Sequence, residues 1–569
     1  MKYGRWLIAG YDRKQAVEYV KGGLNPLISV ILSSRNVTKD EAFGLLDYSK
    51  NEIYDPFLMK DMDRAAERIK LAVERGEKIT VYGDYDVDGI TAGCLMTDYL
   101  RSKGAHCTLF IPDRNEDGYG VRDYALKKIK DGGTSLVVTV DCGMTAAKEA
   151  EYAREIGLDM VISDHHECGE SLPQIPAVNP KREDGNYPNT ALAGVGVAFK
   201  LACAIEGVEH TESMMQRYCD LVALGTIADV MDVTGENRNL IGRGLEIIKK
   251  GSRPGIAALC EASGTDLASV TSTTVGFVLA PKINAAGRIG KTEDAVRLIM
   301  ETDREKAKHF AQLLCSYNRR RQTMEGEMFS DAEKIISPDN DGAPVVLASE
   351  KWHQGIAGIV ASRIAEKYRC PAVVICIKDG VGRGSCRSFG DFELFEAVDD
   401  CADILKSYGG HRSAAGITID EDKIDIFRDR LVKYYRENRR FGEDAAYNID
   451  FEVIKPGLLT LPNVDGLRRL EPFGSGNPTP LLCMMGAKVE TVTVMSGGKH
   501  TKFKITKFGE SYECIKFGKS PEELGICEGC TADVAFQMQV NEYRGRRSVQ
   551  LLLTDMYVHS EENEGQVCG

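Results

Sequence analysis

The hydrophobic pattern between residues 79 and 233 alternates between two kinds of segment. Short apolar runs at residues 79–83, 135–140 and 159–163 are each followed by a longer stretch with helical spacing or by a polar cluster. Apolar runs of this length, bounded by glycine or polar residues, are typical of buried strands. The alternation therefore predicts an α/β domain with a doubly wound, mainly parallel sheet.

The pattern changes after this region. Residues 302–336 contain no helix breaker except Gly326, and they predict one long helix that suits a strut between two lobes. A turn at residues 337–342 leads into a second α/β domain. Its expected elements are strands at 345–348 and 372–377 and helices at 358–367 and 424–435.

The last hundred residues show short strands separated by glycine turns. The expected strands lie at 489–495, 501–507, 513–517, 531–540 and 547–553. Five such strands fit a small barrel of the OB type, a fold that binds single strands in many proteins.

A chain of 569 residues is too long for a single core, so we expect several domains. The expected division is an N-terminal lead-in at 1–60 with one helix at 39–49, a catalytic α/β domain at 61–301, a connecting helix at 302–337, a second α/β domain for substrate binding at 343–440, and an OB-like domain at 448–560.

Composition narrows the class of protein only a little. A hydrophobic content of 43% and a charged content of 28% are ordinary for a globular protein. No apolar run approaches the ~20 residues of a membrane span, and we expect neither a signal peptide nor a membrane association. The 17 cysteines form no disulfide framework, and Cys527 and Cys530 lack the second pair that a zinc site needs. These features predict a cytoplasmic protein.

Candidate chemistry is concentrated where the first apolar run ends. Asp84, Asp86 and Asp88 follow it at two-residue spacing, and a helix is expected to open at Gly89. In an extended segment such side chains share a face, at the sheet edge where α/β proteins bind their ligands. Carboxylates this close repel one another unless a cation neutralises them. A divalent metal site is therefore indicated.

Three later segments bring more groups of the same kind to this edge. Asp141 follows the second run, the sequence Asp164-His165-His166 follows the third, and Asp229 ends a further apolar run. Oxygen ligands with one or two imidazoles suit Mn²⁺ or Mg²⁺ better than a structural zinc. So many acids fit two ions about 3.5–4 Å apart, an arrangement used for in-line displacement at phosphorus.

One observation disfavours a calcium site, and another bears on nucleic-acid binding. An EF-hand calcium loop needs a glutamate six residues after its glycine, where this chain has Leu95. The net charge of −13 disfavours a nucleic-acid binder in general. A nuclease, however, needs only a local basic track.

These motifs resemble those of the DHH phosphoesterase superfamily. The resemblance rests on Gly83-Asp-Tyr-Asp-Val-Asp-Gly89, Val140-Asp-Cys-Gly143, Asp164-His-His166 and Leu224-Gly-Thr-Ile-Ala-Asp229, while Gly409-Gly-His-Arg-Ser-Ala-Ala-Gly416 is similar to the signature of the companion DHHA1 domain. Within the superfamily the chain resembles the RecJ family of single-strand-specific exonucleases. That similarity rests on residues 282–288, 352–363, 384–388 and 470–478.

The resemblance implies a set of metal ligands and catalytic groups. The ligands would be Asp84, Asp86, Asp88, Asp141, His165 and Asp229, with Asp141 bridging two Mn²⁺ or Mg²⁺ ions. His166 would orient the phosphate or protonate the leaving oxygen. Many superfamily members have a histidine near Asp84, which leaves Asp84 open as a direct ligand or as a group behind the ligands.

Substrate contacts are expected around the second α/β domain. Arg387 lies among small residues that would let backbone amides and a bidentate guanidinium hold a phosphate. The full set of expected contacts is Arg288, Gln322, His353, Arg363, Ser385, Arg387, Gly409, Gly410, His411 and Arg412. In the last domain, cations and aromatic residues predict a stacking platform, namely Lys499, Lys502, Phe503, Lys504, Lys507, Tyr543, Arg544 and Arg546.

The implied activity is a metal-dependent 5′→3′ exonuclease that degrades single-stranded DNA to 5′-mononucleotides in repair and recombination. We expect a monomer whose partners are single-stranded DNA and, beyond it, a single-strand-binding protein or a helicase. One alternative is a phosphodiesterase for short oligoribonucleotides or cyclic dinucleotides, although the long helix and the barrel favour a polymer. The other is a non-catalytic scaffold, but none of the expected ligands is missing.

Overall fold

A computed structural model describes residues 5–113, 120–169, 171–336, 342–438, 446–495, 497, 499–543 and 545–559. The chain forms two compact units. The larger unit comprises residues 51–443 and 474–476, and the smaller unit comprises residues 1–50, 444–473 and 477–569. The turn expected at 337–342 lies almost entirely outside the described residues.

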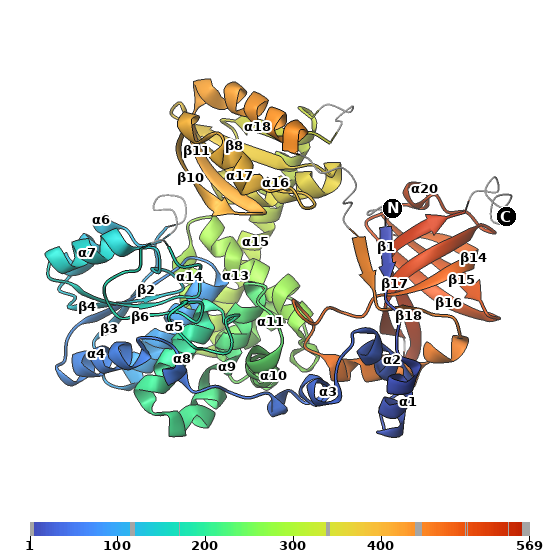
Figure 1. Cartoon of the computed structure of the whole chain (residues 1–569), viewed down its shortest axis with the longest axis horizontal. Coiled ribbons are helices and arrows are strands. Elements are labelled where there is room, and N and C mark those ends of the chain that lie inside the picture. Colours follow the sequence, from blue (N-terminus) through green and yellow to red (C-terminus); the bar gives the residue numbers. More distant parts are fainter. Residues whose placement is uncertain are drawn as a thin grey trace. The chain divides into compact units, whose positions relative to one another are not determined.

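The first sheet of the larger unit is parallel throughout, in the order β3-β2-β4-β5-β6 (Figure 1). Its strands are β2 (Ile79–Gly83), β3 (Cys107–Phe110), β4 (Leu136–Val140), β5 (Asp159–Ser163) and β6 (Ala177–Val178). The strand order reverses between β2 and β4, and the carboxyl edge beside such a switch point is where α/β sheets bind ligands. The parallel sheet confirms the predicted fold class.

Helices cover both faces of this sheet, so its strands are apolar on both sides. The helices α4, α5 and α8 share one core with Ile79, Val81 and Val138, while α6 and α7 share another with Tyr82 and Val137. The helices of this part are α4 (Met62–Glu74), α5 (Val87–Ser102), α6 (Asp123–Asp131), α7 (Ala147–Glu155), α8 (Gly194–Glu206), α9 (Thr211–Ala228), α10 (Gly235–Lys249), α11 (Pro254–Ala262), α12 (Ser272–Thr274), α13 (Ala280–Arg288) and α14 (Thr292–Met300).

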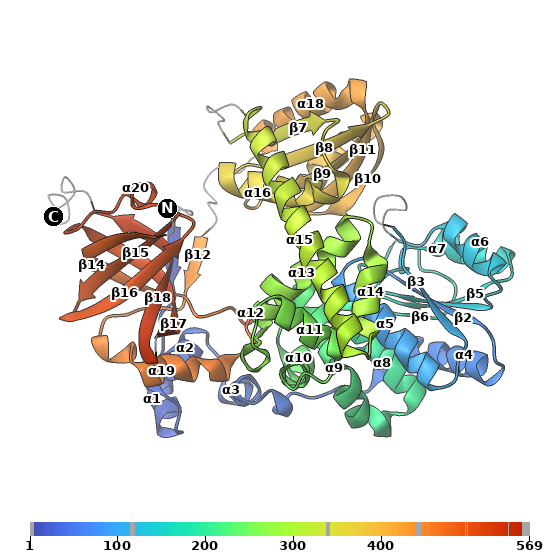
Figure 2. The ribbon, with the colours of Figure 1, turned by 180° about the vertical axis from the view of Figure 1, so that it is seen from behind.

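The long helix α15 (Arg304–Glu333) confirms the predicted strut. Figure 2 shows it running from the helices α11, α13 and α14 toward the second sheet. That sheet has the order β10-β11-β9-β8-β7. Its elements are β7 (Val345–Ser349), α16 (Gln354–Tyr368), β8 (Ala372–Lys378), β9 (Val381–Arg387), α17 (Leu394–Asp399), β10 (Leu405–His411), β11 (Ala414–Asp420) and α18 (Ile424–Asn438).

Two glycine-rich segments of the second sheet are strands. Gly384 lies in β9, and Gly409 lies in β10. Glycine is a poor strand former unless packing favours it. At Gly384 a side chain would collide with Ile375 and Ile417 of the neighbouring strands.

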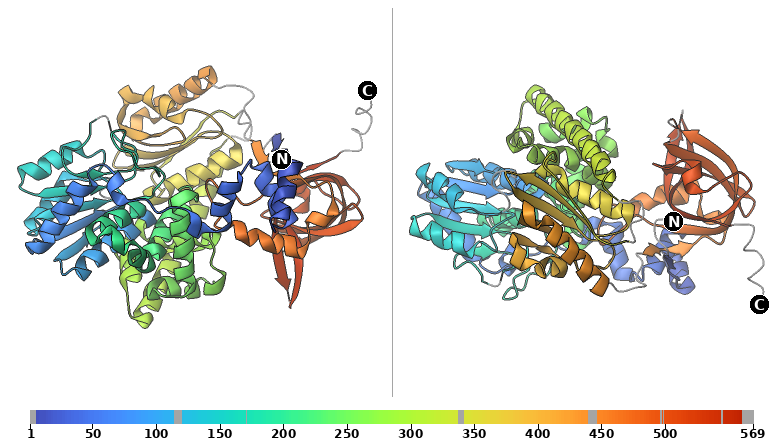
Figure 3. Two further views of the ribbon diagram at one scale, coloured as in Figure 1. Left: turned by 60° about the horizontal axis from the view of Figure 1, so that its bottom comes forward. Right: turned by 90° about the horizontal axis from the view of Figure 1, so that it is seen from above.

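The smaller unit is built around a closed barrel, visible in Figures 1 and 3. Its strands are β14 (Leu482–Met495), β15 (His500–Lys507), β16 (Glu510–Phe517), β17 (Thr531–Tyr543) and β18 (Arg546–Val558), with α20 (Pro521–Leu524) between the third and fourth. The pairing order is β14-β15-β16-β18-β17, and a β14–β17 ladder closes the barrel. This confirms the predicted OB-like domain.

The N-terminal residues pack within the same unit as the barrel. The sequence predicted one helix in this lead-in, whereas its described residues form three α-helices, α1, α2 and α3. Leu27 and Ile28 of α2 join a core with Phe451 and Leu482 of the C-terminal residues. The remaining elements of this unit are β1 (Arg5–Ile8), α1 (Arg13–Lys21), α2 (Pro26–Ser34), α3 (Lys39–Leu46), β12 (Ala446–Ile449), β13 (Phe451–Glu452) and α19 (Leu461–Gly466).

No helix among the described residues combines the length and apolar character needed to cross a membrane.

One buried ion pair joins the helices behind the first sheet. Lys200 of α8 and Glu236 of α10 are 1% and 0% exposed, and they form a salt bridge. Glu236 also accepts hydrogen bonds from the Tyr54 amide (3.0 Å) and the Tyr187 hydroxyl (2.8 Å). These contacts engage both oxygens of the buried carboxylate.

We predict that Lys200→Met destabilises the larger unit by about 3–5 kcal/mol, because Glu236 would stay buried with no cation. Lys103→Met is the matched control, since Lys103 pairs with Glu206 at the surface and should contribute under ~1 kcal/mol. Calorimetry and urea denaturation measure both. Equal losses in the two variants would contradict the role given to the buried pair.

Candidate metal centre and substrate surface

Acidic and imidazole side chains gather where β2, β4 and β5 end. The register pairs Gly83 with Val140 and Val140 with Ser163, so the next residue of each strand, Asp84, Asp141 and Asp164, emerges at one level of the sheet edge. Each strand thereby delivers a carboxylate to the switch point, as the sequence predicted.

Three groups within this cluster have ligand atoms close enough to share an ion. They are Asp84 with Asp86 and Asp141, Asp88 with His165 and Asp229, and Asp141 with His165 and His166, and in each group the atoms lie within 4.8 Å of one another. Asp141 and His165 each belong to two groups. The three groups are therefore linked into one continuous cluster of possible metal ligands.

Asp88 lies in a different kind of secondary structure from the one predicted. The helix α5 begins at Val87, with Asp86 as its N-cap, so Asp88 lies in the first helical turn and not in an extended segment. The three acids therefore do not share one face of a strand, and they divide between two ligand groups. The prediction failed because the N-cap, a position that favours Asp, comes three residues earlier than the glycine suggested.

The helix α8 fixes Asp88. Its first amides, on Gly194 and Val195, donate to the two Asp88 oxygens at 2.6 and 2.9 Å. A helix N-terminus carries partial positive charge and so favours an anion there. Each Asp88 oxygen keeps a second lone pair that an ion can use.

Close approach of the backbone requires glycine at two positions in this cluster. A Cβ on Gly194 would lie 2.4 Å from Asp141 Oδ1, and one on Gly225 would lie 2.6 Å from Asp88 Oδ1. Any larger residue would displace a carboxylate. The small residues of α8 and α9 thus let two helices press directly against the acids.

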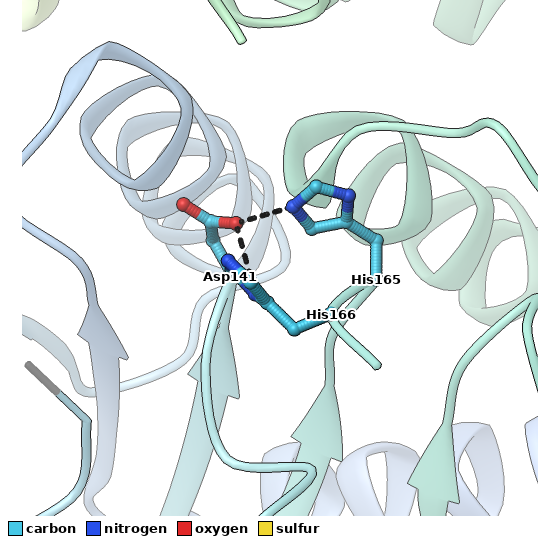
Figure 4. Close-up of side chains that lie close together, drawn as sticks. All are labelled: Asp141, His165 and His166. Carbon is cyan, nitrogen blue, oxygen red and sulfur yellow. Dashed lines mark ion pairs between the residues drawn. The ribbon is translucent and has the colours of Figure 1, made fainter. Parts of the chain in front are cut away.

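The two histidines face Asp141 from the end of β5 (Figure 4). His165 Nε2 lies 3.1 Å from Asp141 Oδ1 and 3.6 Å from Asp229 Oδ2. His166 Nδ1 lies 2.8 Å from Asp164 Oδ1 and 4.0 Å from Asp141 Oδ1. His165 therefore lies among several possible ligands, while His166, although it is also near Asp141, is held by Asp164.

Asp164 organises this turn, a role that the sequence analysis did not assign to it. Its Oδ1 accepts the amides of His165 (2.7 Å) and His166 (3.1 Å), and its Oδ2 accepts the Met144 amide (2.8 Å). These bonds engage both oxygens, so Asp164 orients the histidines. Its position as the first residue of the Asp-His-His motif was the available signal.

The crowded carboxylates change their own proton affinities. Burial raises the pKa of Asp88 and of Asp141 well above the usual range, and neighbouring carboxylates raise each further. Burial and the charge of Asp86 raise the pKa of Asp229 to about 6. Each of these three carboxylates therefore binds a proton more tightly than an isolated, exposed aspartate does.

The two histidines shift in opposite directions. Burial lowers the pKa of His165 to about 4, so its ring is neutral at physiological pH, as a metal ligand must be. Burial also lowers the pKa of His166, but the hydrogen bond and charge of Asp164 outweigh it and raise that pKa to about 9. His166 thus carries a positive charge beside the acids.

The donor set fits divalent ions of the Mn²⁺ or Mg²⁺ kind. It is rich in carboxylates with one neutral imidazole and contains no thiolate ligand. Among the described residues, Asp141 Oδ1 is buried and takes part in no hydrogen bond of regular geometry. A shared cation would satisfy that oxygen and relieve the repulsion around it.

The helix α13 links this cluster to the second α/β domain. Asn284 accepts the Val87 amide at the start of α5 (3.2 Å), and a Cβ on Gly287 would lie 2.6 Å from the Tyr85 carbonyl. At the end of the helix, Arg288 Nη1 donates to the Gly355 carbonyl at 3.0 Å. The helix places Arg288 between the acidic loop and the start of α16.

Four of the expected phosphate contacts share one face of the second sheet. Ser385 of β9 and Gly409 of β10 flank Gly416, and Arg387 and His411 flank Ala414, so each row crosses three strands. Residues directly opposite on paired strands point to the same side. A Cβ on Gly358 of α16 would lie 2.9 Å from Arg387 Nη2. We call these four residues the β9–β10 face.

The other expected contacts are more dispersed. Arg363 pairs with Glu325 (3.4 Å) and stacks on Phe329, and Arg412 pairs with Glu393 (2.7 Å). His353 caps α16 by accepting the Gly355 amide (3.1 Å). Gln322 is exposed on α15, and Gly410 is exposed on β10.

The predicted stacking platform of the barrel needs one correction. Phe503 is 1% exposed and belongs to the core, because β15 alternates inward Phe503 and Ile505 with outward Lys502 and Lys504. Arg544 lies outside the described residues. The exposed aromatic residues that the sequence analysis missed are Phe508, Phe517 and Tyr557.

Comparison with known families and proteins agrees with this arrangement. Residues 78–226 match the N-terminal domain of the DHH family, residues 342–437 match the DHHA1 domain, and residues 449–555 match the RecJ OB domain. The single-stranded-DNA-specific exonuclease RecJ of Bacillus subtilis is 37% identical over 97% of this chain and 71% of its own length.

The chain belongs to the RecJ family of single-stranded-DNA-specific exonucleases. It is an enzyme of that class, with the DHH, DHHA1 and OB domains of the family.

Solved structures from the family share the fold of nearly the whole chain. RecJ from Thermus thermophilus in complex with Mn²⁺ has a TM-score of 0.83 at 29% identity, covering 97% of this chain and 79% of the other. The same protein in complex with Mg²⁺ has a TM-score of 0.77 at 28% identity, covering 97% and 78%.

The charges of the cluster predict a pH dependence for the metal-free protein. His166, whose pKa is raised to about 9, keeps its proton in the folded state where an unfolded histidine loses it, so stability should fall as pH rises from 6.5 to 8. The raised pKa values of Asp88 and Asp141 act in the same direction. Asp141→Asn removes one of the repelling carboxylates and should raise the melting temperature in EDTA at pH 8.

Thermal melts in EDTA at both pH values provide the measurement. Asp131→Asn, which changes an exposed carboxylate beside Lys127, is the control and should leave the melting temperature at pH 8 unchanged. An Asp141→Asn variant that melts no higher than the wild type in EDTA at pH 8 would contradict the charge crowding described here.

Proposed function

We propose that this protein is a metal-dependent 5′→3′ exonuclease that degrades single-stranded DNA to 5′-mononucleotides in DNA repair and recombination. The observation that carries the proposal is the set of three ligand groups, linked through Asp141 and His165, on the carboxyl edge of the first sheet. Family membership supports single-stranded DNA as the substrate, and the cluster of possible metal ligands supports metal-dependent hydrolysis of a phosphodiester.

The residue roles follow from the grouping. Asp84, Asp86 and Asp141 would hold one Mn²⁺ or Mg²⁺ ion, and Asp88, His165 and Asp229 would hold the other, with Asp141 between them. When bound, two such ions supply Lewis-acid stabilisation at phosphorus and activate water. The metal complexes of the Thermus thermophilus protein support this assignment.

His166 is the candidate proton donor. Its ring is charged at neutral pH and 40% exposed, whereas that of His165 is neutral and buried. A charged imidazole beside the ligands can orient a phosphate oxygen or protonate the leaving oxygen. Asp164 holds Nδ1 of this ring at 2.8 Å, so the proton offered to the substrate would be the one on Nε2.

The β9–β10 face is the candidate site for the 5′ end of the strand. Arg387 offers a guanidinium that can hold a terminal phosphate with two hydrogen bonds, and Ser385 offers a hydroxyl beside it. Gly409 and Gly416 are paired on the neighbouring strands β10 and β11. Because neither residue has a side chain, a ligand can approach the backbone at these two positions.

Digestion of strands labelled at either end tests the activity and its direction. We expect 5′-mononucleotides to appear first from the 5′ end of single-stranded DNA in Mn²⁺, with no digestion of blunt duplex. Preference for dinucleotides over long strands would favour the oligoribonucleotide or cyclic-dinucleotide alternative, and strand binding without hydrolysis would favour a scaffold.

Arg387→Ala should weaken binding of 5′-phosphorylated strands by about 1.5–3 kcal/mol, which is roughly tenfold or more in KM, because a charge-assisted contact is lost. Strands with a 5′-hydroxyl should be little affected. The control is Arg430→Ala, which removes a cation from α18, paired with Asp403. An equal effect on both kinds of strand would rule out a 5′-phosphate clamp at Arg387.

For the barrel we propose strand binding along β15 and β16, the strands that bind oligonucleotides in OB folds. Phe517 ends β16 with 58% of its surface exposed, and its ring lies 5.3 Å from that of His500. Phe517→Ala should raise the Kd for a long strand in EDTA by about 1–3 kcal/mol, the usual value of one stacked base.

Phe508→Ala is the matched control, since Phe508 is 43% exposed at the turn that joins the other ends of β15 and β16. Dinucleotide hydrolysis should not change in either variant. Should Phe517→Ala bind long strands as tightly as the wild type does, the barrel would be better explained as a docking surface for a single-strand-binding protein or a helicase.

A further inference from the structure

One sequence motif, Leu470-Glu-Pro-Phe-Gly-Ser-Gly-Asn-Pro478, has no part in the site described so far. Its central residues, Gly474, Ser475 and Gly476, belong to the larger unit, whereas the residues on both sides belong to the smaller one. These three residues contact the loop that follows Asp229. We call residues 474–476 the clip.

The loop from Asp229 to Thr234 begins at the end of α9. The Asp229 amide donates to the Gly225 carbonyl (2.9 Å), and the Met231 amide donates to the Thr226 carbonyl (3.2 Å). Between them Val230 has a φ of 60°, which costs a β-branched residue free energy. The helix end therefore fixes only the near side of the loop.

The clip fixes the far side. The Val233 amide donates to the Ser475 carbonyl at 2.9 Å, and the Ser475 hydroxyl donates to Asp232 Oδ1 at 2.6 Å. Asn237 supports the same stretch by donating to the Asp232 carbonyl at 2.9 Å. The residues three and four positions after Asp229 are thus held through both backbone and side chain.

The two glycines of the clip are needed for this approach. A Cβ on Gly474 would lie 2.9 Å from Val233 Cγ1, and one on Gly476 would lie 3.0 Å from Thr234 Cγ2. Gly476 also has a φ of 72°, in the region that favours glycine. The motif therefore combines the side-chain size and the backbone form that fit against this loop.

The C-terminal end of the clip is fixed by a buried side chain. Asn477 is 4% exposed, and its Nδ2 donates to the carbonyls of Leu470 (2.8 Å) and Pro472 (2.9 Å). Arg35 in turn donates to Asn477 Oδ1 at 3.0 Å. The motif is closed on itself by these bonds, so the clip has a defined shape.

We propose that the clip positions Asp229 for metal binding, with Ser475 as a positioning residue that acts through Asp232 and Val233. The inference rests on the proposed function, in which Asp229 is a ligand of one ion. A ligand on a short loop keeps its orientation only if both ends of the loop are held, and groups behind a ligand commonly contribute about tenfold or more to metal affinity.

Titration of the metal-free, full-length protein with Mn²⁺, followed by electron paramagnetic resonance of the free ion, tests the proposal. Ser475→Ala removes the bond to Asp232, and Gly476→Ala forces the clip away from Thr234. We expect each to weaken binding of one Mn²⁺ ion, by about tenfold for Gly476→Ala, and Ser475→Thr to restore it. At saturating Mn²⁺ the kcat should return toward the wild-type value.

Two further variants make the outcomes distinguishable. Gly509→Ala is the control for backbone strain, since Gly509 has a φ of 79° and no atom within 4 Å of its Cβ position, and it should bind Mn²⁺ normally. Asp229→Asn should lose one ion. If Asp229→Asn loses an ion while Ser475→Ala and Gly476→Ala bind Mn²⁺ as the wild type does, the clip is only structural and the inference fails.

If Asp229→Asn itself binds both ions normally, the metal assignment in the proposed function fails, and this inference fails with it.

Discussion

Repulsion between carboxylates at one edge of one sheet is the constraint around which the larger unit is organised. Six aspartates, Asp84, Asp86, Asp88, Asp141, Asp164 and Asp229, meet there, most of them buried. Two like charges about 4 Å apart repel by about 4 kcal/mol at an effective dielectric constant of ~20. Several of the surrounding elements offset part of this repulsion.

Compensation comes from several directions. The amides at the start of α8 neutralise part of the charge on Asp88, and the charged ring of His166 balances Asp164. Glycines at 194 and 225 let the helices come close enough to do this without displacing the acids. What these groups leave uncompensated is centred on Asp141, the carboxylate that two ligand groups share. Divalent cations bound at this cluster would complete the balance.

The same cluster explains how much of the site could be predicted from the sequence. Asp84, Asp141 and the histidines lie at the expected sheet edge because each comes within three residues of the end of a strand, and parallel strands end at a common edge. The prediction that Asp88 lies in an extended segment was wrong, because α5 begins at Val87, after the N-cap Asp86, and not at Gly89. The position of Asp229 followed from its apolar run, although that run proved to be a helix.

Long-range packing decides local structure where the sequence pattern gives little guidance. In the glycine-rich strand β9, isoleucines of neighbouring strands fill the space that a side chain at Gly384 would occupy. Phe503 was taken for a surface residue because burial along a strand depends on which face meets the core. Contacts between Ser475 and the loop after Asp229 join residues more than two hundred positions apart, and no local pattern signals them.

The central claim is that two ions occupy this edge with Asp141 between them. A crystal structure of the protein with Mn²⁺, using anomalous scattering at the manganese edge, tests it most directly. The account predicts two peaks about 3.5–4 Å apart, one beside Asp84 and Asp86 and the other beside His165 and Asp229, with Asp141 touching both. A single peak, or two peaks with no contact to Asp141, would contradict it.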